Sequence, residues 1–513
     1  MSELKPISVR PWHHLTVGLS LAVIHMLFYL GWSMDDPHIT FRYVENVVRG
    51  DGFVFNPGEA PVEGYSNFLW LLLLLPCRLL LGPDSLMPCA QILGVLCALA
   101  TGPLLALAWQ RTGPPAKDAA PLWRWLPLHL WALSGPAMLW AVGGLETPLV
   151  ALLVTWTLWG LGERWDTDLR RAPLLALVFT LLALARPEGA MYGLAFFAVT
   201  VWGLRRRGTG QIRAWLLALG LFLLALIAYT AWRWWVFDSL LPNTYHAKMG
   251  GALFPRLGRG TAHLGDLILL TGGLPILAWL GLWAWRRSAA VRAAALFAAL
   301  QILFLVWVGG DWMPAGRFLV PAIPCLLLLG TAGLRRSWDG ICSVTEKRGV
   351  RDLLILVLMI WVGLSLFGER QATRELVRLL RAGELHGPLI EAAIWIEQHA
   401  EPGDTFAGEE AGIIPYLTER QFLDLLGIVD AHLAHQPGDL HSKMDVDYVV
   451  NQWRPDWVLL LSTHDVEGEP IRWHSPATEI LVGSEAFQSH YTEVHQIPRL
   501  WGTQVTRIYR RSG

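Results

Sequence analysis

Long apolar runs alternate with short polar segments through the first 370 residues of the chain. Eleven runs have the apolar character of membrane spans, and they lie near residues 15–33, 86–109, 123–141, 147–162, 173–185, 189–204, 214–236, 264–285, 290–308, 318–334 and 351–369. The composition is 53% hydrophobic and only 16% charged, which indicates a polytopic membrane protein. The first run has no small-residue cleavage site before Asp35, so we expect a retained span and not a cleaved signal peptide.

One more apolar stretch, residues 68–81, is short and contains Pro76 and Arg78. Basic loops of membrane proteins stay in the cytoplasm, and the basic loops of this chain share one side only if 68–81 does not cross. We therefore expect a re-entrant or interfacial helix there. With a cytoplasmic N-terminus, the external face then carries the loops at 35–67, 143–147, 186–189, 241–251 and 309–317.

The composition changes near residue 370. A charged segment with helical periodicity is followed by strand-like runs at 404–409, 421–427, 455–462, 491–497 and 503–510. The predicted organisation is an α-helical transmembrane domain at 1–369, whose first external loop is 34–85, followed by a small external α/β domain at 370–513. All five cysteines precede residue 343 and have no metal-binding spacing, so we expect them to be packing residues.

The adjacent carboxylates Asp35 and Asp36 directly follow the first apolar run. Two close negative charges raise the pKa of one of them, which suits a general base. The same pair can instead hold a divalent cation. Further along this loop, Glu63 is either a structural residue or a substrate contact. The pair is the strongest candidate for catalysis in the chain.

Charged and polar residues recur in the other external loops. Glu146 either caps the following helix or lines a polar site. Arg186 and Glu188, between two apolar runs, form either a structural pair or a phosphate or sugar contact. The remaining candidates for substrate binding are the polar residues of two further loops, Asn243, Tyr245, His246, Lys248, Asp311 and Arg317, with Arg317 the first choice for a leaving phosphate.

The middles of the apolar runs carry almost no ionisable group apart from His25 and His129, which we expect to be packed and neutral. Ion-coupled transporters place such groups near the membrane midplane. A membrane-surface enzyme is therefore favoured over a carrier, although a lipid-linked-sugar flippase and a non-catalytic scaffold stay open as alternatives. The net charge of −1 gives no sign of a nucleic-acid partner.

The external loops also resemble a known family. "DDPHITFRYVENVVRGDGFVFNPGEAPVEGYSNFLW" (35–70) resembles the first external loop of membrane glycosyltransferases of the C superfamily (GT-C). It is most similar to the branch that contains the terminal arabinofuranosyltransferases of mycobacterial and corynebacterial cell walls. "GGLET" (143–147), "LARPEG" (184–189), "LPNTYHAK" (241–248) and "GGDWMPAGRF" (309–318) resemble further blocks of that branch in the same order.

The resemblance implies an inverting transferase that moves a sugar, with arabinofuranose as the first expectation, from a polyprenyl-phosphate donor. The acceptor would be a glycan, lipid or protein of the cell envelope. Asp35 and Asp36 would be catalytic, with a divalent cation possible, and Arg42 and Tyr65 would join the substrate-binding residues. The protein would lie in the bacterial cytoplasmic membrane, with its active site and C-terminal domain on the periplasmic side.

Overall fold

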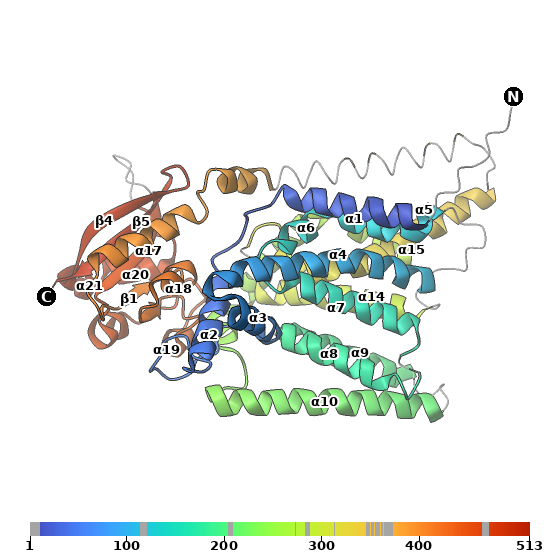
Figure 1. Ribbon diagram of the computed structural model, residues 1–513, viewed down its shortest axis with the longest axis horizontal. Coiled ribbons are helices and arrows are strands. Elements are labelled where there is room, and N and C mark those ends of the chain that lie inside the picture. The colour runs from blue at the N-terminus through green and yellow to red at the C-terminus, as the bar shows by residue number, and fades with distance from the viewer. Residues whose placement is uncertain are drawn as a thin grey trace. The chain divides into compact units, whose positions relative to one another are not determined.

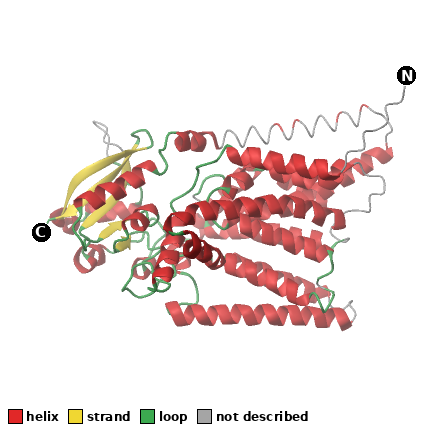
Figure 2. Cartoon of the chain, in the orientation of Figure 1, coloured by secondary structure: helices red, strands yellow, loops and turns green. Residues whose placement is uncertain are grey.

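The computed structural model describes residues 11–112, 121–165, 167–203, 209–271, 273–282, 288–311, 313–344, 373–463 and 471–512, with isolated positions at 349, 353, 360 and 363. It is mostly helical, with one sheet near the C-terminus (Figure 2). The chain forms two compact units. The first comprises Met1–Trp32, Gln91–Leu226 and Pro255–Glu375, and the second comprises Ser33–Ala90, Ile227–Phe254 and Leu376–Gly513.

The first unit is built from apolar helices (Figure 1). They are α1 (Pro11–Leu27), most of α4 (Leu86–Thr112), α5 (Pro121–Ala132), α6 (Gly135–Ala141), α7 (Thr147–Gly162), α8 (Ala172–Ala185), α9 (Pro187–Gly203), most of α10 (Thr209–Phe237), α12 (Leu253–Leu270), α13 (Leu274–Gly281), α14 (Ala289–Val308), the 3₁₀ helix η4 (Arg317–Ala322) and α15 (Ile323–Val344). Its core is rich in aromatic rings, and Phe179 alone contacts Phe196, Phe197, Phe222 and Phe297.

Four segments in the described part of the chain are long and apolar enough to cross a membrane: Pro83–Thr112, Gln211–Phe237, Ala289–Val308 and Arg317–Gly340. The eleven predicted spans thus include several helices that are shorter than this length. The run at 351–369 lies almost wholly outside the described residues. The helix predicted at 68–81 is present as α3 (Phe68–Leu81), and its position at a membrane interface stays a prediction.

Two predicted spans are each broken into two helices. The run at 123–141 is divided at Ser134, which is extended, and α6 begins after it with Pro136 in its first turn, a position that proline favours. The run at 264–285 is divided at Gly273, whose φ of +77° is in the left-handed region, with Pro275 just behind it. Each of these runs therefore forms two helices, because the small residue and the proline end one helix and begin another, and the number of membrane crossings stays a prediction.

The second unit contains the first loop, the C-terminal end of α10 and a mixed sheet. Its helices are α2 (Pro37–Arg49), α3, the 3₁₀ turn η1 (Pro83–Ser85), α11 (Asn243–Lys248), α17 (Gly387–His399), α18 (Ile413–Thr418), α19 (Ala431–Ala434), the π-helix η5 (Tyr448–Trp453), α20 (Pro476–Gly483) and α21 (Glu485–His490). The boundary predicted near residue 370 stays a prediction, since much of 345–372 lies outside the described residues.

The sheet has the strand order β2-β1-β3-β5-β4. Its strands are β1 (Phe406–Gly408), β2 (Phe422–Asp424), β3 (Trp457–Thr463), β4 (Tyr491–Arg499) and β5 (Gln504–Arg511), and each overlaps one of the predicted runs. Strands β2, β1 and β3 are parallel, whereas β5 and β4 are antiparallel additions.

Side chains of the central strand β3 alternate between the two faces of the sheet. Val458 and Leu460 belong to a buried cluster with Leu481 of α20 and Phe487 of α21. On the other face, Trp457 contacts Trp395 of α17. Helices therefore cover both faces, which explains why β3 reads as a continuous apolar run and not as an alternating one.

Candidate functional site

Asp35 lies between α1 and α2, and its partly buried carboxylate is held by the C-terminal part of the chain. One carboxylate oxygen, Oδ2, accepts the backbone N–H of Gly412 at 2.8 Å. The other, Oδ1, accepts the N–H of Ile413 at 2.6 Å. These N–H groups open the short helix α18, where the first backbone donors have no partner within the helix. A residue of the first loop thus receives a fixed orientation from a segment almost 380 positions later.

The electrostatic surroundings of Asp35 favour its protonated form. Burial raises the pKa of Asp35 to about 8, and the negative charges of Glu410 and Asp36 act in the same direction. The hydrogen bonds from Ile413 and Gly412 oppose this shift but do not cancel it. The sequence predicted that one aspartate of the pair raises the pKa of the other. It did not predict the larger effects of burial and of Glu410 on the pKa of Asp35. A carboxyl with a pKa close to the working pH is suited to taking a proton from a hydroxyl group.

The divalent cation considered for the Asp35–Asp36 pair stays a prediction. Each oxygen of the Asp35 carboxylate accepts one backbone N–H group, which leaves a lone pair on each oxygen. In the described part of the chain, no three His, Cys, Asp or Glu side chains are grouped as metal ligands.

Arg42, expected at the substrate, is buried and its donors bind backbone. It donates to the carbonyl oxygens of Phe55 at 2.7 Å and Arg420 at 2.6 Å, to Asn56 Oδ1 at 3.1 Å, and to the carbonyl of Pro415. The guanidinium also lies over the Phe55 ring. In this structure Arg42 joins the first loop to the segment that follows α18, so it supports the surroundings of Asp35.

Glu63 is buried and pairs with Arg233 of α10, with 2.7 Å between Glu63 Oε2 and Arg233 Nε. Burial is the largest effect on this group and raises the pKa of Glu63 to about 7, although Arg233 acts in the opposite direction. Tyr65 is buried against Tyr43, and its hydroxyl has no hydrogen-bond partner among the described residues. Of the two readings open for Glu63, the structure shows the ion pair, and it assigns no substrate contact.

The segment predicted to bind phosphate at 243–248 forms the short helix α11. The Asn243 amide donates to the carbonyl oxygens of Gly427, Ile428 and Asp430, so it anchors this helix to the loop after β2. His246 stacks on His435 with 4.5 Å between ring centroids. Tyr245 is 42% exposed, and its ring contacts that of His246.

A second group of predicted residues lies in the first unit. Arg186 Nη1 is 2.7 Å from Glu146 Oε1, and Arg186 Nε pairs with Glu188. All three side chains are buried. The predicted Arg186–Glu188 pair is therefore present, and Glu146, at the start of α7, joins it. Two carboxylates surround one guanidinium, so this group has little positive charge left for a phosphate.

Arg317 differs from Arg186 because its pairing is loose. Its Nη2 is 3.5 Å from Asp311 Oδ1, at the limit of hydrogen bonding. Asp311 instead accepts the backbone N–H groups of Met313 and Phe318, both at 3.2 Å. Arg317 is 6% exposed, and its Nε has no hydrogen-bond partner among the described residues. Among the predicted cations, Arg317 therefore keeps the donor capacity that a phosphate ligand needs.

The sequence analysis missed the residues that surround Asp35 from the C-terminal side. Glu409 and Glu410 directly follow β1, Gly412 and Ile413 bind the Asp35 carboxylate, and Arg499 pairs with Glu410. The available signal was "FAGEEAG", an acidic pair followed by a glycine at the carboxyl end of a strand. The strand was predicted, but the two carboxylates after it were not singled out.

Comparisons with known proteins agree with the resemblance noted in the sequence. Residues 375–510 match a family model described as a domain of unknown function, DUF8728. A terminal β-(1→2)-arabinofuranosyltransferase of Mycobacterium tuberculosis is 31% identical over 250 residues, which are 46% of this chain and 38% of that protein. Its namesake from Corynebacterium glutamicum is 26% identical over 403 residues, covering 65% of this chain and 52% of that protein. The chain thus spans about half or less of these relatives' length.

Solved structures share the fold at low sequence identity. ArnT from Cupriavidus metallidurans, crystallised with undecaprenyl phosphate, aligns over 97% of both chains with a TM-score of 0.52 and 15% identity. An oligosaccharyltransferase from Archaeoglobus fulgidus, tethered to an acceptor peptide, aligns over 95% of this chain and 80% of its own with a TM-score of 0.58 and 11% identity. The expectation that this chain shares the fold of such transferases is therefore confirmed, as is its similarity to the arabinofuranosyltransferase branch, whereas the eleven spans and the external C-terminal domain stay predictions.

Proposed function

We propose that this protein is an inverting membrane glycosyltransferase that moves a sugar from a polyprenyl-phosphate donor to an acceptor hydroxyl. The observation that carries the proposal is Asp35, a carboxyl in the first loop with both oxygens held in place and a pKa raised to about 8. The names of the curated relatives support the transfer of arabinofuranose. The lipid bound by ArnT, which has the same fold, supports a polyprenyl-phosphate donor.

The reaction follows from the chemistry of these groups. Asp35 takes the proton from the acceptor hydroxyl as its oxygen attacks the anomeric carbon, and the bond from that carbon to the phosphate oxygen breaks. A single displacement of this kind inverts the anomeric centre. The polyprenyl phosphate leaves with an additional negative charge, which the partly unpaired guanidinium of Arg317 stabilises. Asp36 is the second negative charge beside Asp35 and keeps its proton affinity high.

The membrane arrangement is part of the proposal. Eleven spans place the first loop, the active site and residues 370–513 on the periplasmic side of the bacterial cytoplasmic membrane. The four long apolar segments and the shorter apolar helices support membrane insertion. Single cysteines introduced in the loops and labelled with a membrane-impermeant maleimide would test this topology, with the native cysteines replaced first.

The function is tested with purified protein, radiolabelled polyprenyl-phosphate sugars with arabinofuranose first, and an arabinan oligosaccharide. We expect label in the oligosaccharide, with the anomeric configuration opposite to that of the donor. Scrambling of the lipid-linked sugar across liposomes, without any transfer product from the donor panel, would contradict the proposal and indicate a flippase.

A further inference from the structure

The carboxyl end of β1 lies where sheets of this topology bind ligands. The strand order β2-β1-β3 puts the two parallel neighbours on opposite sides of β1. The chain therefore runs from β1 to β2 on one side of β1 and then continues to β3 on the other side. In open parallel sheets, such a switch point opens a crevice at the carboxyl ends of the strands, and ligands bind there.

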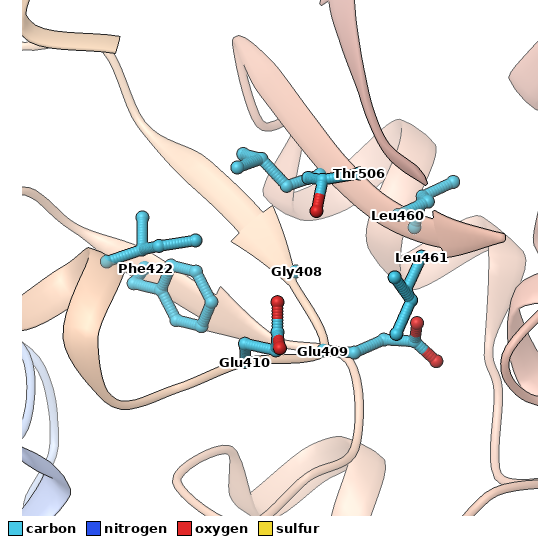
Figure 3. A pocket seen from close by; sticks show the side chains of 9 residues that line it. Gly408, Glu409, Glu410, Phe422, Leu460, Leu461 and Thr506 are labelled. Atoms are coloured by element: carbon cyan, nitrogen blue, oxygen red, sulfur yellow. The ribbon is translucent and has the colours of Figure 1, made fainter. Parts of the chain in front are cut away.

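A small pocket that is partly open to solvent lies at this point of the sheet. Gly408 at the end of β1 and the following Glu409 and Glu410 line it, together with Phe422 of β2 and Thr506 of β5. Figure 3 shows that the two glutamates point to opposite sides of the chain, with the Glu410 carboxylate between Phe422 and Gly408 and the Glu409 carboxylate beside Leu461. The lining thus combines two carboxylates with apolar side chains.

Two buried polar atoms in this region lack partners. Glu409 is 7% exposed; its Oε1 accepts the hydroxyls of Ser475 at 2.6 Å and Thr478 at 2.7 Å, whereas Oε2 has no hydrogen-bond partner among the described residues. Arg499 is 9% exposed and pairs with Glu410 at 2.7 Å, and its Nε likewise has no partner in the described part of the chain. Burial of an acceptor and a donor that make no hydrogen bond costs folding free energy. A ligand whose hydroxyl groups bind both atoms would remove this cost.

The same backbone segment carries the contact with Asp35. Gly412 and Ile413, which bind the Asp35 carboxylate, come two and three residues after Glu410. The charges of Glu410 and Asp35 are close enough to act on each other. A ligand at the carboxyl end of β1 would therefore lie next to the candidate base. The two glutamates here have cationic neighbours, with Arg499 2.7 Å from Glu410 and His474 3.7 Å from Glu409, so the charges largely balance and the place suits a neutral sugar.

We propose that the carboxyl end of β1 is the subsite for the acceptor sugar, with Glu410 and Arg499 as its hydroxyl-binding residues. This inference rests on the proposed transferase function and gives a role to the domain at 375–510. A carboxylate paired with a guanidinium offers acceptor and donor atoms together, which matches the hydroxyl groups of a furanose. The Phe422 ring offers an apolar surface for the C–H groups of the sugar.

Calorimetric titration of the full-length chain with an arabinan oligosaccharide tests the subsite without any donor. We expect Glu410→Gln to weaken binding about 10- to 100-fold, because a hydrogen bond to a charged group is lost. Glu397→Gln is the matched control: Glu397 also pairs with an arginine, Arg420, at 2.7 Å, but it is exposed on α17. It should leave binding unchanged. Arg499→Lys retains the positive charge but not the planar donor group, and should weaken binding as well.

Thermal unfolding of each variant separates loss of the site from loss of the fold. If Glu410→Gln does not fold, Arg499→Lys decides the question. Binding that is equal in Glu410→Gln and Glu397→Gln, or a wild-type chain that does not bind the oligosaccharide, overturns the subsite. A wild-type chain that binds the oligosaccharide but transfers no sugar instead contradicts the proposed function and leaves the subsite standing.

Discussion

Replacing Asp35 by asparagine removes the proposed base and changes little else in shape. General-base assistance contributes about 10²–10⁴ in rate, which corresponds to about 2.7–5.5 kcal/mol of activation free energy. We therefore expect kcat of Asp35→Asn to fall by at least about 100-fold under saturating donor and acceptor. The affinity for the donor should stay close to that of the wild type, because the substitution leaves Arg317 untouched.

The hydrogen bonds of Asp35 set the expected cost in stability. Asparagine has one carbonyl oxygen, so it can accept only one of the two N–H groups that Gly412 and Ile413 present. Its amide N–H₂ then faces the other N–H, and this unsatisfied donor costs about 1–3 kcal/mol. The variant should still fold, with a slightly lower melting temperature in the same detergent.

Asp456→Asn is a control of the same chemistry at the other end of β1. Asp456 Oδ2 accepts the backbone N–H of Thr405 at 2.8 Å and its hydroxyl at 2.9 Å, and Thr405 precedes β1. In this variant the one carbonyl oxygen of asparagine can replace Oδ2 and keep both hydrogen bonds, so the variant should retain its stability and its kcat. Wild-type turnover in Asp35→Asn refutes the base assignment. Equal loss of turnover in both variants shows that the effect comes from the fold and not from proton transfer.

Three further predictions test the surroundings of this group and the phosphate ligand. The pKa of about 8 means that only about a tenth of Asp35 is ionised at pH 7, so kcat/KM should rise with pH until about 8. Glu410→Gln removes a negative charge beside Asp35 and should move this rise to lower pH. An unchanged pH profile in Glu410→Gln would contradict the electrostatic coupling of the two carboxylates. Arg317→Ala should raise KM for the donor about 10-fold or more, and Arg317→Lys should recover part of it; unchanged kcat and KM would remove Arg317 from the site. Gly412→Ala places a methyl group 2.1 Å from the carbonyl oxygen of Asp35, so turnover should fall strongly. Glu419→Ala, an exposed change at the other end of α18, should leave turnover unchanged.

Several parts of this protein could be predicted from the sequence because they depend on local pattern. Apolar runs predict helices wherever the chain has no interruption, and each of the five strand-like runs overlaps an observed strand. The breaks at Ser134 and Gly273 were missed, although glycine and proline mark both of them. The importance of Asp35 could also be predicted, since an acidic pair directly after an apolar run is costly unless it serves a purpose.

Only the tertiary structure shows what surrounds these residues. The segment 409–413 is more than 370 positions from Asp35, and no periodicity or spacing relates the two. The same holds for Arg42 and Asn243, whose polar side chains look available in the sequence but bind backbone carbonyls of the C-terminal part. The pKa of Asp35 depends on burial and on Glu410, and both are products of packing. The sequence by itself determined which residues can do chemistry, whereas hydrogen bonding and desolvation in the folded chain decided which of them remain free to do it.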